Sequence, residues 1–324
     1  MRLAQVDRWN DLASSEENGQ PHPVWPDFFI VGAQNSATST LYAFLRQHPD
    51  IFMPALKEPH YFSQLPPVWH MQYPITHVSR QDSYLSLFSA VGKTKYKGEA
   101  SSSYLWSDDA PSRIHRANPS AKIVIILRNP VERAYSHYLM DVREGRQSLP
   151  FMDAIQEDWS RRDKGYGVSR LYVELGLYYR QVKRYLAIFG RKQVKVVLFR
   201  HLITALENRG EGLDDLASLL EIDPVPLKNL AAVRSENSFG VARNEWVRRL
   251  AGSKLTRRMA QVLVPKRLGG TFAIRRHLFE PFLVKQAIRP SMDPTAKNWL
   301  RKIYREDIFA LEHLLAKPLP ELHH

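Results

Sequence analysis

Short apolar runs alternate along the chain with longer segments in which apolar residues recur at helical spacing. Three of the short runs are almost continuously apolar and rich in β-branched residues, which predicts strands that are buried on both faces: residues 28–31, 122–127 and 194–199. Helical spacing and Pro or Gly boundaries predict helices at residues 41–45, 131–142 and 177–189. This alternation predicts an α/β fold, a three-layer sandwich in which helices cover both faces of a central, mostly parallel sheet.

Length and composition fit a folded core that follows a short arm. The chain has 324 residues, 44% of them hydrophobic, which excludes an intrinsically disordered protein. Residues 1–25 are polar, so we expect an N-terminal arm followed by a single domain over residues 26–324. The absence of cysteine excludes disulfides, thiolate metal sites and a cysteine nucleophile. Because the apolar runs are short and the first residues are charged, we expect no membrane span, no export signal and a cytoplasmic location.

Positive charge is concentrated in one segment. The formal net charge is +13, and residues 243–289 hold twelve basic residues against two acidic ones. Such an excess fits a nucleic acid, an anionic membrane or an anionic small ligand. The sequence contains no recognisable nucleic-acid-binding module, so we expect an anionic ligand and no nucleic acid.

Small and hydroxyl-bearing residues fill the turn between the first predicted strand and the first predicted helix. Backbone N–H groups at a helix N-terminus can hold an anion together with neighbouring hydroxyls, here those of Ser36, Thr38, Ser39 and Thr40. The nucleotide-triphosphatase pattern requires Gly-x4-Gly-Lys before a Ser or Thr, whereas here Gly32 is followed five residues later by Ala37 and then Thr38, with no lysine before the hydroxyl. Taken alone, the turn fits either an anion-binding loop or an ordinary helix capped by Ser or Thr.

Later motifs give the chain a resemblance to a known family. Residues 28–41 resemble the 5′-phosphosulfate loop of sulfotransferases that use 3′-phosphoadenosine 5′-phosphosulfate (PAPS), in particular heparan sulfate N- and 3-O-sulfotransferases and their bacterial relatives. Residues 57–62, 98–104 and 127–138 are similar to further motifs of that family in the same order. Several ordered motifs are far more specific than any one alone.

This resemblance implies a P-loop-like phosphosulfate-binding loop and a donor site. It assigns the following residues to the 5′-phosphosulfate: Asn35, Ser36, Ala37, Thr38, Ser39 and Thr40. It assigns Arg128 and Ser136 to the 3′-phosphate of PAPS and of its product 3′,5′-ADP (PAP), a task suited to a guanidinium and a hydroxyl near a strand end. A salt bridge across strand ends is the structural alternative for Arg128. The resemblance implies no metal.

Two residues match the family's catalytic machinery. Glu58 matches the general base that takes the proton from an acceptor hydroxyl or amine, and His60 matches a histidine that supports this base in the 3-O branch. The alternative for Glu58 is a solvated carboxylate paired with Lys57. The alternative for His60 is a ring packed beside Tyr61.

Three departures from the family's motifs bear on activity. The family usually carries lysine at the positions of Asn35 and Ala100, and loss of one charged donor to a developing anion costs ~3–4 kcal/mol, or roughly 10²–10³ in rate. Nearby lysines could supply the charge: Lys57, Lys95 and Lys97. The family carries glycine at Ala37, and we expect the Cβ there to restrict the backbone angles of the loop.

The sequence thus predicts in-line transfer of a sulfuryl group from PAPS to an acceptor hydroxyl or amine, with Glu58 as base. The alternative is a catalytically impaired relative that binds nucleotide or polyanion, because Asn35 and Ala100 replace lysines. A carbohydrate is the first expectation for the acceptor, an acidic one included, and a lipid or another small molecule is the alternative. Aromatic residues between Gln64 and Tyr84 fit either stacking on sugar rings or burial in a surface loop.

Overall fold

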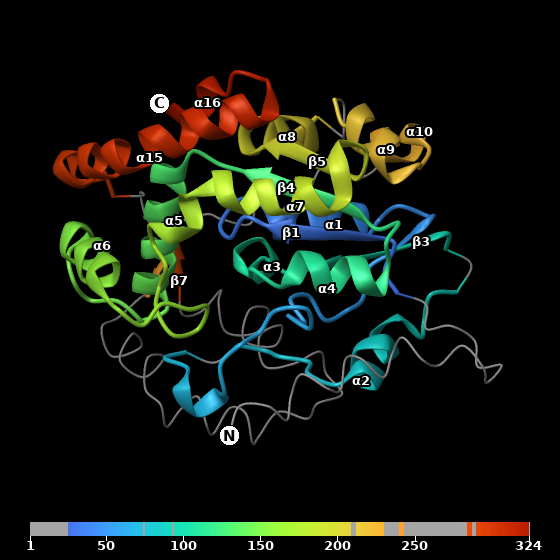
Figure 1. Cartoon of the computed structure of the whole chain (residues 1–324), viewed down its shortest axis with the longest axis horizontal. Coiled ribbons are helices and arrows are strands. Elements are labelled where there is room, and N and C mark those ends of the chain that lie inside the picture. Colours follow the sequence, from blue (N-terminus) through green and yellow to red (C-terminus); the bar gives the residue numbers. More distant parts are fainter. Residues whose placement is uncertain are drawn as a thin grey trace.

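A five-stranded parallel sheet forms the centre of the protein in the computed structural model (Figure 1). The structure describes residues 25–73, 75–92, 94–208, 212–229, 240–242, 284–286 and 290–323. The strand order is β2-β3-β1-β4-β5. The strands are β1 (Phe28–Gly32), β2 (Ile51–Phe52), β3 (Tyr96–Ala100), β4 (Lys122–Leu127) and β5 (Val194–Leu198). A separate antiparallel pair joins β6 (Gly240–Ala242) and β7 (Val284–Gln286).

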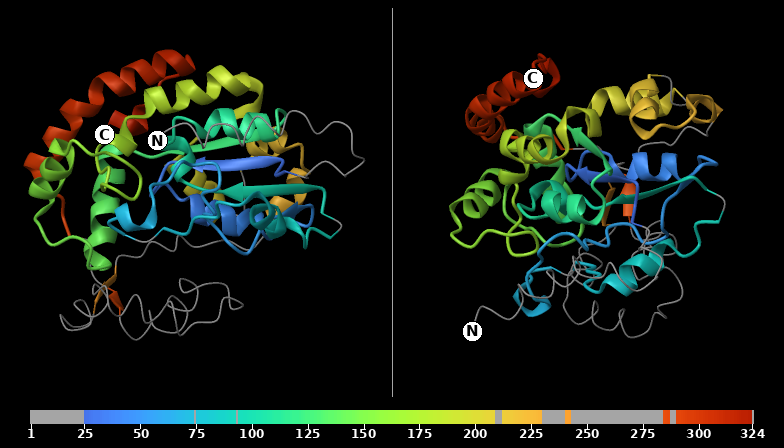
Figure 2. Two further views of the ribbon diagram at one scale, coloured as in Figure 1. Left: turned by 60° about the horizontal axis from the view of Figure 1, so that its bottom comes forward. Right: turned by 45° about the vertical axis from the view of Figure 1, so that its right-hand side comes forward.

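Helices cover both faces of the main sheet (Figures 1 and 2). One layer contains α3 (Ser103–Trp106), α4 (Ala110–Ala117), α5 (Pro130–Arg143), α6 (Phe151–Ser160), α7 (Tyr178–Gln193), α15 (Pro294–Leu315) and α16 (Pro320–His323). The other contains α1 (Thr38–Leu45), α8 (Phe199–Glu207), α9 (Asp214–Leu220) and α10 (Pro224–Asn229). Alternate residues of β1 enter opposite layers, with Phe29 in the first and Phe28 in the second. The predicted three-layer α/β sandwich is confirmed.

The predicted elements form with small shifts at their ends. The helix predicted to begin at residue 41 begins at Thr38, directly after the loop. The helix predicted at 177–189 forms the first part of α7 and ends at Gly190 as expected, because a φ of 71° is not helical. The strand predicted to end at Phe199 ends one residue earlier, because Phe199 begins α8. The pattern did not reveal β3, whose sequence includes Lys97, Gly98 and Glu99 but which is buried over its last three residues.

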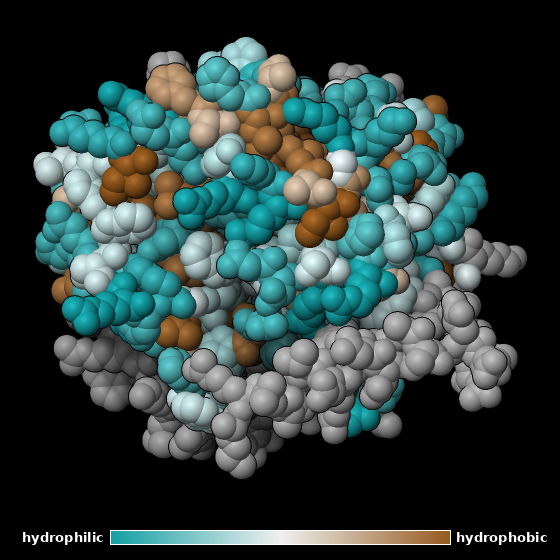
Figure 3. Space-filling view, viewed as in Figure 1, coloured by the Kyte–Doolittle hydropathy of each residue, from teal (hydrophilic) through white to brown (hydrophobic). Residues whose placement is uncertain are grey.

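Shorter elements connect β2 to β3: η2 (Val68–His70), α2 (Gln81–Leu85) and η3 (Ser86–Phe88), while η4 (Glu174–Gly176) precedes α7. Residues 1–24 of the predicted arm and almost all of the basic segment lie outside the described residues. None of the helices within the described ranges has the length and apolarity that a membrane crossing requires. Figure 3 shows a largely hydrophilic face in which hydrophobic side chains form small separate patches.

Close packing fixes how β3 sits in the sheet. An added Cβ at Gly98 would lie 2.1 Å from Phe28 Cζ and 2.4 Å from Met53 Sδ. Both neighbours are themselves buried, so neither ring nor sulfur has space to withdraw. Glycine is therefore the residue that allows β1 and β3 to pair at this position.

A carboxyl group is completely buried beside this contact. Glu99 is 0% exposed, and its Oε2 accepts hydrogen bonds from the hydroxyls of Tyr104 (2.7 Å) and Tyr84 (2.9 Å). Burial raises the pKa of Glu99 to about 7, although hydrogen bonds from Tyr104, Ser101 and Tyr84 act in the opposite direction. The Tyr104 hydroxyl also accepts from the backbone N of Phe62, so Glu99 is tied to the segment that carries the predicted catalytic residues.

Gly98→Ala should lower the free energy of unfolding by about 1–3 kcal/mol, because the methyl group overpacks a rigid core. Urea unfolding measures this change. Gly165→Ala is the matched control. Its Cβ would lie 3.3 Å from a Val168 side-chain carbon, so the expected loss in the free energy of unfolding is small. Equal losses in the two variants would contradict the packing argument.

Glu99 should make stability pH-dependent. Its pKa is higher in the folded than in the unfolded protein, so its contribution to folding is complete below pH 4.5 and is lost as pH rises through 7. The free energy of unfolding of the natural chain relative to Glu99→Gln should fall by about 3 kcal/mol between pH 4.5 and pH 8. Denaturation at both pH values tests this, with the exposed Glu221→Gln as control; a pH-independent difference would refute it.

Candidate functional site

The predicted site residues meet where β1, β3 and β4 end. The loop before α1 follows β1, and the backbone N of Ser101, directly after β3, donates to the carbonyl oxygen of Ile30. The backbone N of Glu58 donates to Ala100 O at 3.0 Å, which brings a distant segment to the same edge. Arg128 follows β4, and its Nη1 donates to the carbonyl oxygen of Asn35 at 3.1 Å. Carboxyl ends of parallel strands are a common place for ligand binding.

The loop before α1 adopts left-handed backbone angles without glycine. Asn35 has φ 61°, and Ala37, the N-cap of α1, has φ 65° and ψ 22°. The Cβ of Ala37 permits this left-handed conformation, although the conformation favours glycine. Such a conformation costs ~1–2 kcal/mol for a residue with a Cβ, so the surrounding packing must hold it.

Several polar groups of this loop lack partners. Ser36 Oγ is buried without a hydrogen bond, and so are the amide oxygens of Gln34 and Asn35. Within the described ranges, no group accepts a hydrogen bond from the backbone N–H groups of residues 34–40. Since an amide can present its NH₂ in place of its oxygen, these groups can all donate to an anion. Thr38 and Thr40 are buried, whereas Ser39 is exposed.

The residues assigned to the 3′-phosphate flank the start of α5. Asn129 caps that helix by accepting from the backbone N of Val131 at 3.0 Å, and its Nδ2 donates to Leu322 O in α16. Arg128 is half-buried with its guanidinium 4.5 Å from the Phe199 ring, and Ser136 is half-buried on α5. Helix capping and the C-terminal helix thus hold the backbone that carries both groups.

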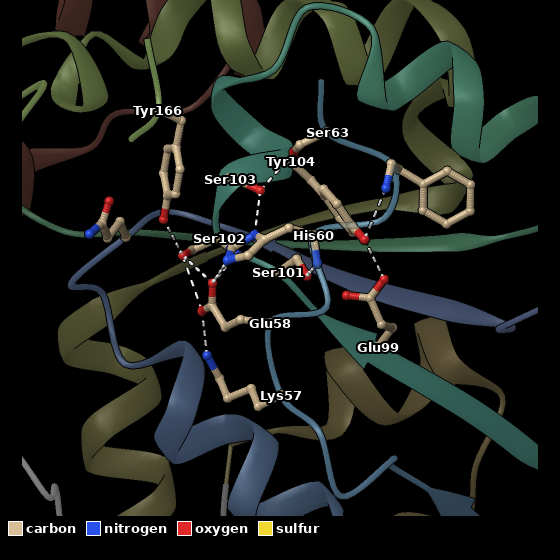
Figure 4. Close-up of polar contacts among 12 residues, drawn as sticks. Lys57, Glu58, His60, Ser63, Glu99, Ser101, Ser102, Ser103, Tyr104 and Tyr166 are labelled. Atoms are coloured by element: carbon tan, nitrogen blue, oxygen red, sulfur yellow. Dashed lines mark hydrogen bonds and ion pairs between the residues drawn. The ribbon is translucent and has the colours of Figure 1, made fainter. Parts of the chain in front are cut away.

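Glu58 lies at the centre of a polar network (Figure 4). Its Oε1 is 2.5 Å from Lys57 Nζ, and its Oε2 is 3.2 Å from His60 Nε2. Ser102 donates to Oε2 through its hydroxyl at 3.0 Å and its backbone N at 3.3 Å. The pairing with Lys57 proposed as the alternative for Glu58 does occur. The carboxylate is nevertheless only 26% exposed and is bound by groups from two further positions.

His60 connects Glu58 to a chain of buried hydroxyls. Its Nδ1 lies 2.7 Å from Ser103 Oγ, which in turn lies 2.7 Å from Ser63 Oγ. These contacts assign the Nε2 proton to the bond with Glu58 and leave Nδ1 as an acceptor from Ser103. Its ring also packs 5.6 Å from that of Tyr166, and the Tyr166 hydroxyl is 3.2 Å from Ser102 Oγ. His60 therefore orients Glu58 as well as packing against an aromatic ring.

Glu58 and His60 differ in charge at neutral pH. Burial favours the neutral form of Glu58, but the nearby Lys57 and His60 and the hydrogen bonds from Lys57 and Ser102 outweigh it and lower the pKa to about 2. Burial lowers the pKa of His60 to about 4, and Glu58 only partly opposes this shift. At neutral pH, Glu58 is ionised and His60 is a neutral imidazole.

Of the three lysines that could supply the missing positive charge, two lie at the end of the sheet opposite the site. Lys95 is 3.6 Å from Asp50, and Lys97 is 3.8 Å from Asp27, which directly precedes β1. Lys97 stands three residues before the end of β3, about 10 Å along the strand. Lys57 is therefore the one of the three that the structure brings to the site.

Several residues of the network were not predicted from the sequence. Ser102 and Ser103 lie in a motif that was recognised, and three successive hydroxyl residues after a strand were an available signal. Tyr166 comes from the loop after α6, and no local pattern connected it to Glu58. Across the ranges described, no three His, Cys, Asp or Glu side chains are grouped to hold a metal ion.

The chain is similar to known proteins in structure and in sequence. A sulfotransferase from Alicyclobacillus acidocaldarius superposes with a TM-score of 0.65 over 93% of this chain and 100% of its own, at 28% identity. Human carbohydrate sulfotransferase 15 is 25% identical over 246 residues, 58% of this chain and 43% of that protein. Human heparan sulfate glucosamine 3-O-sulfotransferase 6 is 32% identical over 114 residues, 35% of this chain and 30% of that protein.

The chain thus spans less than half the length of these curated relatives. The model of the sulfotransferase family matches residues 26–208, more than half of the chain and the part that contains the loop, the Glu58 network and Arg128. The chain belongs to the sulfotransferase family.

Proposed function

We propose that the protein transfers a sulfuryl group from PAPS to a carbohydrate hydroxyl or amine, with Glu58 as the general base. The observation that carries the proposal is the placement of a loop rich in unpartnered donors at the same edge as an ionised, oriented carboxylate. The names of the curated relatives support a carbohydrate as the acceptor.

The donor fits this edge through two sets of groups. The N–H groups of the loop and the positive end of the α1 dipole suit the 5′-phosphosulfate. Arg128 and Ser136 suit the 3′-phosphate, which distinguishes PAPS from ATP. In the transfer, the acceptor oxygen or nitrogen forms a bond to sulfur while the bond from sulfur to the bridging oxygen breaks. The electron pair remains on the 5′-phosphate of 3′,5′-ADP, and the acceptor proton passes to Glu58.

A second candidate function is nucleotide or polyanion binding without transfer. It is favoured by the uncharged side chains of Asn35 and Ala100 and by the low pKa of Glu58, since a carboxylate with a pKa of about 2 is a weak base. Incubation with labelled PAPS and a panel of carbohydrate, lipid and small-molecule acceptors separates the two functions: label on an acceptor supports transfer, and binding without label supports the alternative.

3′,5′-ADP should stabilise the protein more than AMP or ATP does. A ligand at 100 times its dissociation constant raises the free energy of unfolding by ~2.7 kcal/mol, which a thermal-shift series detects. Arg128→Ala and Ser136→Ala should remove the advantage of 3′,5′-ADP over AMP and leave AMP binding nearly unchanged. If the natural chain shows no such advantage, the assignment of the 3′-phosphate to Arg128 and Ser136 is wrong.

Glu58→Gln should slow transfer by roughly 10²–10⁴-fold, because the amide cannot accept the acceptor proton. Binding of 3′,5′-ADP should persist, because none of the groups assigned to the nucleotide changes. Initial rates with labelled PAPS and calorimetric titration with 3′,5′-ADP give the two quantities. Glu221→Gln, an exposed carboxylate paired with Lys122, is the control. A Glu58→Gln variant with the natural rate would exclude Glu58 as the base.

A further inference from the structure

The loop proposed to bind the 5′-phosphosulfate contains no charged side chain. Residues 33–40 are small, or carry a hydroxyl or an amide. Arg128 touches the loop, but its Nη1 donates to a carbonyl oxygen and its guanidinium lies over Phe199. His137, 3.5 Å from Gln34, is neutral, because burial and three nearby arginines hold its pKa well below the ordinary value. The charge that develops on a leaving oxygen here requires a cation from another segment.

Lys57 is a cation at this edge of the sheet. The hydrogen bond from Glu58 N to Ala100 O holds the neighbouring backbone of Lys57 beside the end of β3. In Figure 4 its ammonium points to the Glu58 carboxylate. The side chain is 20% exposed, and its ammonium pairs with the Glu58 carboxylate. Because the ammonium is not fully enclosed, an anion that binds beside it can compete with Glu58 for the positive charge.

We propose that Lys57 stabilises the leaving group of sulfuryl transfer by moving from Glu58 to the 5′-phosphate when the donor binds. The inference rests on the proposed function. As the bond from the acceptor atom to sulfur forms and the bond from sulfur to the bridging oxygen breaks, the electron pair left on that oxygen is stabilised by the Lys57 ammonium. The acceptor proton passes to the Glu58 carboxylate that Lys57 has left.

This movement also strengthens the base. Lys57 is a principal cause of the low pKa of Glu58. Without the ammonium, the carboxylate keeps its bonds to Ser102 and His60, but it loses its nearest positive charge and its proton affinity rises. Donor binding and base activation are thus coupled through a single side chain. Before the donor binds, Lys57 and Glu58 neutralise each other.

The test moves the positive charge from position 57 to the loop before α1. Lys57→Met keeps an apolar stem, with Lys57→Gln as a second variant, and Asn35→Lys places an ammonium in the loop. Calorimetry compares 3′,5′-ADP with adenosine 3′-phosphate, which lacks the 5′-phosphate. A second arm measures transfer from labelled PAPS to desulfated heparan sulfate. Lys95→Ala is the control, because this lysine pairs with Asp50 at the opposite edge.

Lys57→Met should slow transfer about 100-fold and reduce the affinity advantage of 3′,5′-ADP over adenosine 3′-phosphate. Asn35→Lys combined with Lys57→Met should recover at least tenfold in the transfer rate and at least tenfold in this affinity advantage. Lys95→Ala should change neither quantity. If desulfated heparan sulfate is not an acceptor, the binding arm decides alone. Melting transitions of all variants report whether each is folded.

Other results would overturn the inference. If Lys57→Met keeps both the transfer rate and the 5′-phosphate advantage, Lys57 has no part in the reaction while the proposed function stands. If Lys57→Met slows transfer but keeps the 5′-phosphate advantage, Lys57 acts only by holding Glu58. If the natural chain neither prefers 3′,5′-ADP over AMP nor transfers label to any acceptor, the proposed function fails and the inference fails with it.

Discussion

The parallel pairing of β1 with β3 and β4 is the constraint on which the proposed site depends. Phe28 pairs with Gly98 on one side and Lys122 on the other, so the three strands end at one edge. A shift by one residue would place Lys97 or Glu99 where only glycine fits against the Phe28 ring. The register is therefore set by core packing, and the loops that hold the anion-binding groups, Glu58 and Arg128 inherit their positions from it.

Two carboxylates near this edge show how local partners decide charge. Glu99 receives hydrogen bonds from hydroxyls alone, and burial raises its pKa to about 7. Glu58 lies beside an ammonium and an imidazole, and its pKa falls to about 2. The Ser101 hydroxyl accepts from the backbone N of His60, which links the segment of one carboxylate to that of the other. Glu99 thus supports the backbone by hydrogen bonding, while Glu58 holds a charge that can act on a substrate.

The sequence predicted the layers of the fold because buried parallel strands carry a strong apolar pattern, as in residues 122–127. It did not predict β3, since Gly98 and Glu99 are required by contacts with other segments and interrupt that pattern. The placement of Glu58 beside the loop followed from ordered motifs, whereas the roles of Ser102 and Tyr166 depend on tertiary contacts across 44 and 64 residues of chain. The opposite positions of Lys57 and Lys97 likewise depend on strand direction, which spacing along the sequence does not reveal.

Left-handed backbone occurs in both segments that form the site, at Asn35, Ala37, Glu58 and His60. None of the four is glycine, so each conformation costs free energy that surrounding contacts must offset. Those contacts are present: Ala37 is buried in the core, and the backbone N of Glu58 and of His60 is bound to Ala100 and Ser101. The fold therefore imposes the shape of the loop before any anion arrives. What the loop lacks is charge, and that makes the position of a nearby ammonium decisive for the chemistry.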